Sequence, residues 1–141
     1  MNHTHSITVV GRQRILGTED RQQSRVLGRR MEKDGAVLMT YDEMQEGGTA
    51  VHVSLKLAGN RAVMIRNGAG QSRMEFDPGR TTYCSYDTGA GILPLEIRTQ
   101  TVSRQSNTRE ERIRLSYTLL CDGDVLSHNE VTMRLVPITT C

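Results

Sequence analysis

Seven polar side chains stand where the spacing of the apolar residues around them predicts the dry face of a strand. Each lies in a stretch where apolar and polar residues alternate, and each occupies a position that the alternation assigns to the apolar face. Hydroxyl, amide and charged groups that converge in an apolar cavity are typical of a small-molecule site. The sequence therefore predicts a ligand-binding site made by Tyr41, Glu43, Arg66, Thr99, Tyr117, Ser127 and Asn129.

The same positions also have a purely structural interpretation. Glu43, Ser127 and Asn129 fall near expected strand ends, where inward side chains already meet water. A buried tyrosine such as Tyr117 usually finds a hydrogen-bond partner without any ligand. The residue types alone leave both interpretations open.

Arginine supplies nearly all the positive charge, since Lys33 and Lys56 are the only lysines. Arg66 could hold a ligand anion at the mouth of a barrel, or it could pair with Glu75 across a hairpin as a weak surface ion pair. Other arginines fall on wet faces of late strands, where interspersed glutamates favour a mixed-charge surface over a phosphate-binding stripe. These are Arg98, Arg109, Arg112, Arg114 and Arg134.

The remaining motifs do not make a catalytic or metal site. Asp87-Thr88-Gly89 is the triplet of aspartic proteases, but Tyr83-Cys84-Ser85-Tyr86 stands where those enzymes have an apolar strand. We interpret the triplet as a strand end followed by a turn. His3 and His5 have no carboxylate or cysteine that completes a metal site. We therefore expect no enzyme activity, no metal and no cofactor.

Length and composition suit one domain over residues 1–141. The formal net charge of +2 is too small to mark a dedicated nucleic-acid binder, and with no Trp and one Phe few rings can stack on bases. No segment resembles a signal peptide or a membrane helix of about 18 apolar residues. An odd set of cysteines, Cys84, Cys121 and Cys141, suits a reducing compartment. We expect a cytoplasmic monomer or homodimer that does not bind membranes.

Turn signals divide the chain into short alternating segments, which is typical of an all-β barrel or sandwich. Glycine and asparagine in these signals accept the positive φ of tight hairpins. A sheet of this size with one dry face tends to close, so we predict a single closed antiparallel β-barrel of about eight to ten strands. The signals include Asp34-Gly35, Gly47-Gly48, Gly59-Asn60, Asn67-Gly68, Pro78-Gly79, Gly89-Ala90-Gly91, Ser106-Asn107 and Asp122-Gly123.

Three stretches need separate predictions. Residues 18–33 lack helical spacing and contain Gly28, so we favour a strand there. The last two strands, over 109–121 and 124–136, are expected to be the longest. Alternation places Val125 on the dry face with Val131, Met133 and Leu135.

The order and spacing of several short motifs resemble a bacterial domain family of unknown function, DUF1934. The resemblance covers about residues 7–136. The matching pieces are Tyr41-Asp42-Glu43, Met64-Ile65-Arg66-Asn67-Gly68, Phe76-Asp77-Pro78-Gly79, Tyr86-Asp87-Thr88-Gly89-Ala90-Gly91, Leu95-Glu96-Ile97-Arg98-Thr99, Ile113-Arg114-Leu115-Ser116-Tyr117 and Val131-Thr132-Met133.

This resemblance implies a calycin-like barrel, the architecture of lipocalins and fatty-acid-binding proteins, but no activity or site residues. The Gly-x-Trp motif of lipocalins is absent, because Gly11 is followed by Arg12-Gln13. The Arg-x-Tyr motif of fatty-acid-binding proteins is also absent, because Arg134 is followed by Leu135-Val136. Two functions remain open: a non-enzymatic protein that binds a small, partly apolar ligand, or a protein- or RNA-interaction module that uses its arginine-bearing outer surface.

Overall fold

The computed structural model describes residues 3–44, 47–68, 70–87 and 90–138. These residues form ten strands and no helix, in agreement with the all-β prediction. The strands are β1 (His5–Ile15), β2 (Thr18–Lys33), β3 (Ala36–Met44), β4 (Ala50–Ala58), β5 (Arg61–Asn67), β6 (Gln71–Phe76), β7 (Thr82–Asp87), β8 (Ile92–Ser106), β9 (Glu111–Cys121) and β10 (Asp124–Pro137).

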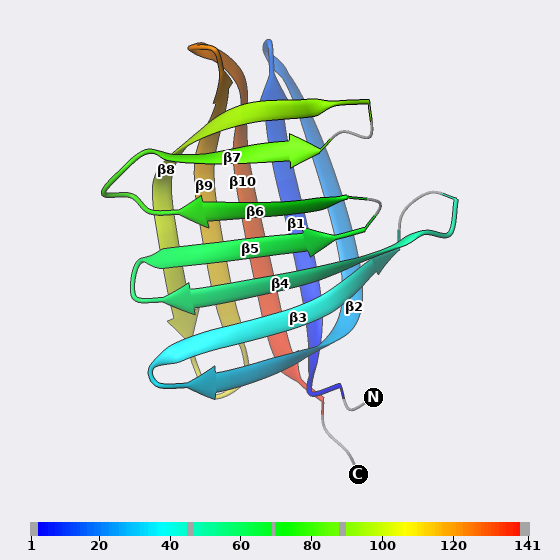
Figure 1. Cartoon of the computed structure of the whole chain (residues 1–141). Coiled ribbons are helices and arrows are strands. Elements are labelled where there is room, and N and C mark those ends of the chain that lie inside the picture. Colours follow the sequence, from blue (N-terminus) through cyan, green and yellow to red (C-terminus); the bar gives the residue numbers. More distant parts are fainter. Residues whose placement is uncertain (1–2, 45–46, 69, 88–89, 139–141) are drawn as a thin grey trace.

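All ten strands belong to one antiparallel sheet with the order β6-β5-β4-β3-β2-β1-β10-β9-β8-β7. The sheet folds over into two layers whose strands run crosswise, with β3 to β7 in one layer and β1, β9 and β10 in the other (Figure 1). Strands β6 and β7 are the two edges of this sheet, and no backbone pairing joins them among the described residues. At that seam the Thr82 hydroxyl donates a hydrogen bond to the Glu75 carbonyl oxygen at 2.6 Å. The barrel is therefore nearly closed.

Strand β2 forms one corner of the barrel, and Gly28 explains how it turns. Its first part pairs with β1, and residues 28–33 pair with β3. A Cβ atom on Gly28 would lie 2.5 Å from the Thr40 carbonyl oxygen and 2.6 Å from the Ile7 Cδ1 atom. Only glycine lets the two layers approach so closely at this bend. The predicted strand over 18–33 is confirmed.

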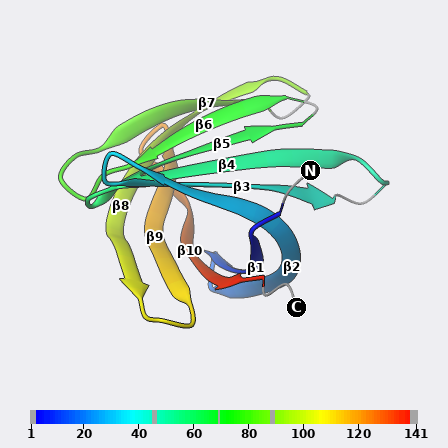
Figure 2. The ribbon, with the colours of Figure 1, turned by 90° about the horizontal axis from the view of Figure 1, so that it is seen from below.

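Strand β8 forms the opposite corner, where a β-bulge does the bending. Residues 92–97 pair with β7, and residues 96–106 pair with β9. The register shifts between Thr99 and Thr101, so Gln100 is the extra residue. Its side-chain amide donates a hydrogen bond to the Thr118 hydroxyl at 3.2 Å, which holds the bulge against β9. Figure 2 shows the two layers meeting along β2 and β8.

Inward-facing aliphatic residues from both layers fill the space between them. The central cluster includes Ile7, Met39, Leu55, Phe76 and Leu115, each at most 1% exposed. Burying a side chain of this size contributes about 1.5–3 kcal/mol. The core explains why the strands alternate, because every second residue must enter it.

Three two-residue turns close hairpins with positive φ at both positions. Asp34-Gly35 and Asp122-Gly123 were predicted from their composition. The third is Leu16-Gly17, where Leu16 has a φ of 48°. Leucine carries no turn signal, so the sequence did not predict this hairpin.

Two sequence predictions about the strands are wrong. The longest strands are the corner strands β2, with 16 residues, and β8, with 15 residues, because each spans both layers. Val125 does not lie on the dry face and is 52% exposed. A bulge between Val125 and Ser127 inserts Leu126, which reverses the face that Val125 occupies.

An ion-pair network closes the end of the barrel near both corner strands. Glu111 opens β9 with a side chain that is 8% exposed, and it accepts hydrogen bonds from Arg30 of β2 and Arg104 of β8. Arg104 also bonds Glu32 at 3.2 Å. Burial alone would raise the pKa of Glu111, but the two arginines outweigh it and hold this pKa below its ordinary value. The network joins the two layers where the apolar core ends.

Candidate functional site

A row of polar side chains crosses the inner face of β8, β9 and β10. Tyr117 stands in the middle, with Thr99 opposite it on β8 and Asn129 opposite it on β10. The Asn129 amide donates a hydrogen bond to the Ser127 hydroxyl at 2.9 Å, and Ser127 is 3% exposed. The strand register thus brings together four of the seven predicted site residues.

The other three residues face this row from the opposite layer. Glu43 and Arg66 lie on β3 and β5, on either side of β4, and form a two-pronged ion pair with bonds of 3.0 and 3.4 Å. Tyr41 precedes Glu43 by two residues on the same inner face and is 4% exposed. Burial, followed by the charge of Glu43, raises the pKa of Tyr41 well above its usual range.

The expected alternative pair between Arg66 and Glu75 is wrong. Arg66 lies opposite Ser72 on the inner face, whereas Glu75 lies opposite Val63 on the outer face. A residue on the outer face of β6 cannot reach an inward guanidinium. Glu75 instead pairs with Arg73 and Arg80.

Electrostatics and packing link the two halves of the site. Burial raises the pKa of Tyr117 to about 12, and the positive charge of Arg66 across the barrel acts in the opposite direction. The Tyr117 ring packs on Phe76 with 4.7 Å between ring centroids. Tyr41 lies apart from this region, against Gly28 at the β2 corner and far along the sheet from Ser127. We call the region around Arg66, Glu43, Tyr117, Thr99 and Asn129 the polar end of the barrel.

Thr99 is the unusual member of the polar end. It is 9% exposed, and its hydroxyl oxygen has no hydrogen-bond partner within the described residues. A buried hydroxyl without a partner costs about 1–3 kcal/mol. Native proteins keep few such groups, so each calls for a physical explanation.

A small hollow of about 150 Å³ lies beside Tyr117 and Asn129. Gly11, Gln13 and Gln22 of β1 and β2 also line it. A Cβ atom at Gly11 would have no heavy atom within 4 Å, so the interior is open at this position. Sequence reasoning missed Gln13 and Gln22, whose inward orientation becomes visible only from the register with β10 and β2.

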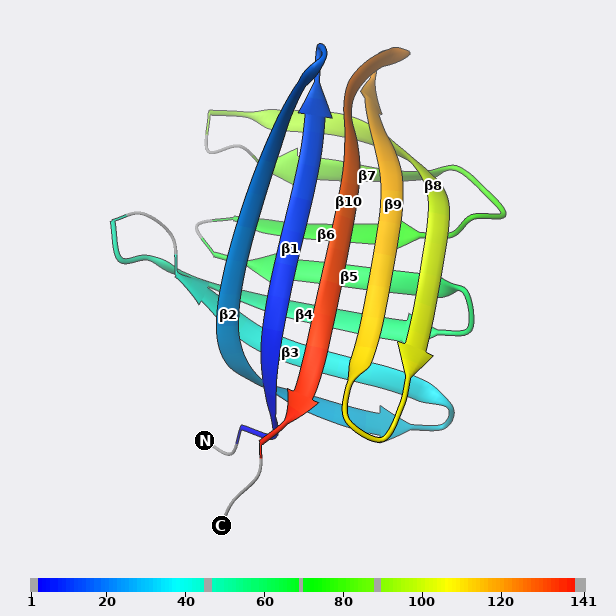
Figure 3. The ribbon, with the colours of Figure 1, turned by 180° about the vertical axis from the view of Figure 1, so that it is seen from behind.

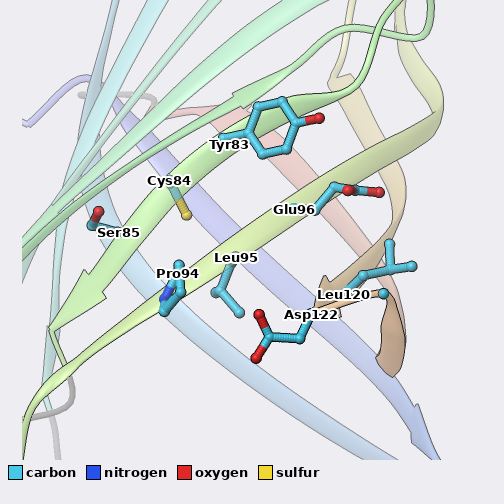
Figure 4. A pocket seen from close by; sticks show the side chains of 9 residues that line it. Tyr83, Cys84, Ser85, Pro94, Leu95, Glu96, Leu120 and Asp122 are labelled. Carbon is cyan, nitrogen blue, oxygen red and sulfur yellow. The ribbon is translucent and has the colours of Figure 1, made fainter.

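A larger groove of about 440 Å³ runs between the β7–β8 ladder and the β9–β10 turn (Figure 4). Tyr83, Cys84, Glu96 and Asp122 are among its lining residues, and none of the seven predicted residues is. Glu96 already accepts a hydrogen bond from Arg98 at 2.7 Å. Burial raises the pKa of the Cys84 thiol, which disfavours the reactive thiolate. The groove therefore presents no activated chemical group.

The other motifs add no site. Asp87 ends β7, while Thr88, Gly89 and Cys141 lie outside the described residues. No group of three His, Cys, Asp or Glu side chains in the described ranges could hold a metal ion. Likewise, the described chain contains no helix that is long and apolar enough to cross a membrane.

Comparison with known proteins identifies relatives of this chain but no activity. A search among curated proteins finds no match. The crystal structure of the ywiB protein from Bacillus subtilis matches with a TM-score of 0.84 and 20% identity, covering 97% of this chain and 93% of that chain. At that identity the match shows the fold alone. The model of the domain of unknown function DUF1934 matches residues 7–133, and the chain therefore belongs to this family.

Proposed function

We propose that this chain is a non-enzymatic binding protein that takes a small, partly apolar ligand into the polar end of the barrel. The buried hydroxyl of Thr99, which has no partner among the described residues, carries the proposal. A ligand that bonds this hydroxyl would remove the cost of leaving it unpaired.

The neighbours of Thr99 define the chemistry of the ligand. Tyr117 and Asn129 offer a hydroxyl and an amide in the same row, and Phe76 and Val131 offer apolar surface beside them. Arg66 and Glu43 already neutralise one another. This charge balance favours a neutral or zwitterionic ligand with one apolar side.

The packed core limits the size of the ligand. The residues of the apolar cluster beside the polar end are almost fully buried, and the hollow beside Tyr117 measures about 150 Å³. A water molecule occupies about 30 Å³ in the liquid, so the hollow matches a ligand of roughly five to ten heavy atoms.

A thermal-shift screen of small neutral and zwitterionic compounds tests this function. A compound present at about 100 times its Kd stabilises the folded state by about 2.7 kcal/mol. We expect compounds that raise the melting temperature of the wild type and of Thr101→Val, but not that of Thr99→Val. Thr101 is the matched control, because it is exposed on the outer face of β8 only two residues away.

Two outcomes would contradict the proposal. Equal shifts in all three proteins would place binding outside the polar end. A screen without any stabilising compound would mean that the polar end serves the structure alone.

A further inference from the structure

The outer face of β2, β1, β10, β9 and β8 carries a dense set of arginines. These five strands lie side by side (Figure 3). In this part of the described structure, their register forms four consecutive cross-strand rows, which run from the β1–β2 turn toward the middle of the sheet. The outward positions of these rows are otherwise mostly Ser, Thr and Gln. The arginines, all exposed, are Arg12, Arg14, Arg21, Arg25, Arg98, Arg112, Arg114 and Arg134. We call this surface the arginine face.

Positive charge is concentrated on the arginine face. Its eight arginines stand against four carboxylates on it or at its border, Glu19, Glu96, Glu110 and Glu130, which leaves a formal excess of four positive charges. Because the whole chain has a formal net charge of +2, the rest of the sequence carries a formal charge of −2. The small net charge thus hides a strong asymmetry between surfaces.

The members of the arginine face that lie on β1 and β2 differ from the arginines of the opposite layer. Arg61, Arg73 and Arg80 on the opposite layer each pair with a carboxylate. Among the described residues, by contrast, Arg12 and Arg14 have no ion pair. Arg21 bonds only the neutral side chain of Gln23, and Arg25 only that of Ser6. A general preference for arginine in the composition would not produce this segregation.

The register also places like charges directly opposite one another. Arg12 faces Arg21 on β2, and Arg112 faces Arg134 on β10. Opposed like charges on neighbouring strands destabilise a sheet. Glu110 bridges the second pair, but no described carboxylate bridges the first. Such local conflicts are typical of functional sites.

A hollow of about 220 Å³ lies on the arginine face, where Arg12 and Arg14 line it together with Glu19 and Glu130. The two carboxylates balance the two guanidinium groups, so this hollow is not a phosphate site by itself. The attraction for phosphate comes instead from the arginines spread over the four rows.

We propose that the arginine face binds the phosphate backbone of double-stranded nucleic acid without reading its sequence. The four rows contain no Phe or Tyr, so single-stranded bases have no ring on which to stack. Backbone contacts from Arg, Ser, Thr and Gln side chains give affinity and position without base readout. Four rows over five strands span roughly 20 by 19 Å, which matches about six base pairs along one duplex. This surface lies outside the barrel, so the proposal is independent of the ligand-binding function.

Fluorescence anisotropy with a labelled RNA duplex of about 20 base pairs tests the proposal, over about 25 to 200 mM KCl. Two double variants each remove two positive charges. Arg12→Gln with Arg14→Gln changes the arginine face, and Lys33→Gln with Lys56→Gln changes exposed side chains elsewhere that also have no described ion pair. Circular dichroism confirms that both double variants are folded.

We expect the wild type to bind, with an affinity that falls linearly as the logarithm of the salt concentration rises. Removing two phosphate contacts lowers the slope by about 2 and the affinity at low salt by roughly tenfold or more, whereas the lysine variant stays within about twofold. A DNA duplex should bind like the RNA duplex, and a single strand more weakly.

Four results would overturn the proposal. They are no binding of the duplex at the lowest salt, equal loss in both double variants, tighter binding of a single strand, or capture by phosphatidylserine vesicles that the duplex does not reverse.

Discussion

Replacing Glu111 by Gln should weaken the protein strongly, because this carboxylate joins the two layers at the closed end of the barrel. The variant keeps the shape of the side chain but removes its charge. Arg30 and Arg104 would then stand beside a neutral amide, with only Glu32 as a remaining partner. The free-energy cost of burying the two charged arginines would then be only partly offset.

The magnitude follows from the burial of the three side chains. Removing one partner from a buried ion pair costs about 3–5 kcal/mol. Glu111 is 8% exposed, whereas Arg30 is 19% and Arg104 is 32% exposed, so water relieves part of the loss. We expect about 3 kcal/mol, which lowers the melting temperature of a domain of this size by roughly 10 °C.

Glu110→Gln is the matched control, because Glu110 is the next residue and also pairs with two arginines, Arg112 and Arg134. Its two arginine partners are 60% and 52% exposed, and pairs with exposed partners contribute little. The melting temperature of this variant should therefore change by less than about 2 °C. The assay is thermal unfolding of both variants and the wild type at several pH values.

The pH dependence has a definite sign. The pKa of Glu111 is lower in the folded state than its ordinary value of 4.5. Its stabilising contribution is therefore complete above that value and disappears as the pH falls through the lowered pKa. The difference between wild type and Glu111→Gln should shrink in acid. Equal melting temperatures for the Glu111 and Glu110 variants near neutral pH would refute the reasoning.

Three substitutions, together with one control variant, test the packing and the polar end. Gly28→Ala should cost about 2–3 kcal/mol in urea unfolding, because its Cβ meets a backbone oxygen and a core methyl group, while Gly11→Ala should be nearly neutral. A cost shared by both glycine variants would contradict the tight corner. Thr99→Val should stabilise the ligand-free protein by up to about 1 kcal/mol, since it removes a hydroxyl without a described partner, and a clear loss would show that the hydroxyl is bonded. Tyr117→Phe should remove the tyrosine absorbance change with a midpoint of about 12, and an unchanged titration would contradict the burial of this ring.

Much of the fold could be predicted because alternation and turn chemistry act over a few residues. The inward residues Val53, Leu55 and Leu57 and the turn at Asp34-Gly35 are local signals of this kind. The corners could not be predicted in the same way. Whether Gly28 bends a strand or Gln100 bulges out depends on residues far away in the sequence that pack against them.

The membership of the polar end could be predicted, but its pairing could not. Parity alone placed Glu43, Arg66 and Thr99 on inner faces. The partner of Arg66 depends on which strands flank β5 and which face each carboxylate occupies, and this requires the register. Val125 shows the limit of reasoning from alternation, because one inserted residue in a bulge changes the face on which a side chain lies.

The arginine face could be predicted only in part, for a similar reason. Composition reports only the sum of charges, and a sum of +2 suggested no affinity for nucleic acid. Arg12 and Arg21 lie nine positions apart in the sequence but opposite each other in the sheet. Only strand pairing shows that positive charge gathers on one side.

Native mass spectrometry of the protein purified from its own host tests the central claim most directly, by comparing the native mass with the denatured mass. The binding function predicts a small non-covalent adduct on the wild type that disappears on unfolding. The adduct should be lost from Thr99→Val and kept on Thr101→Val. A bare native mass for the wild type, or an adduct that both variants retain, would contradict a ligand at the polar end of the barrel.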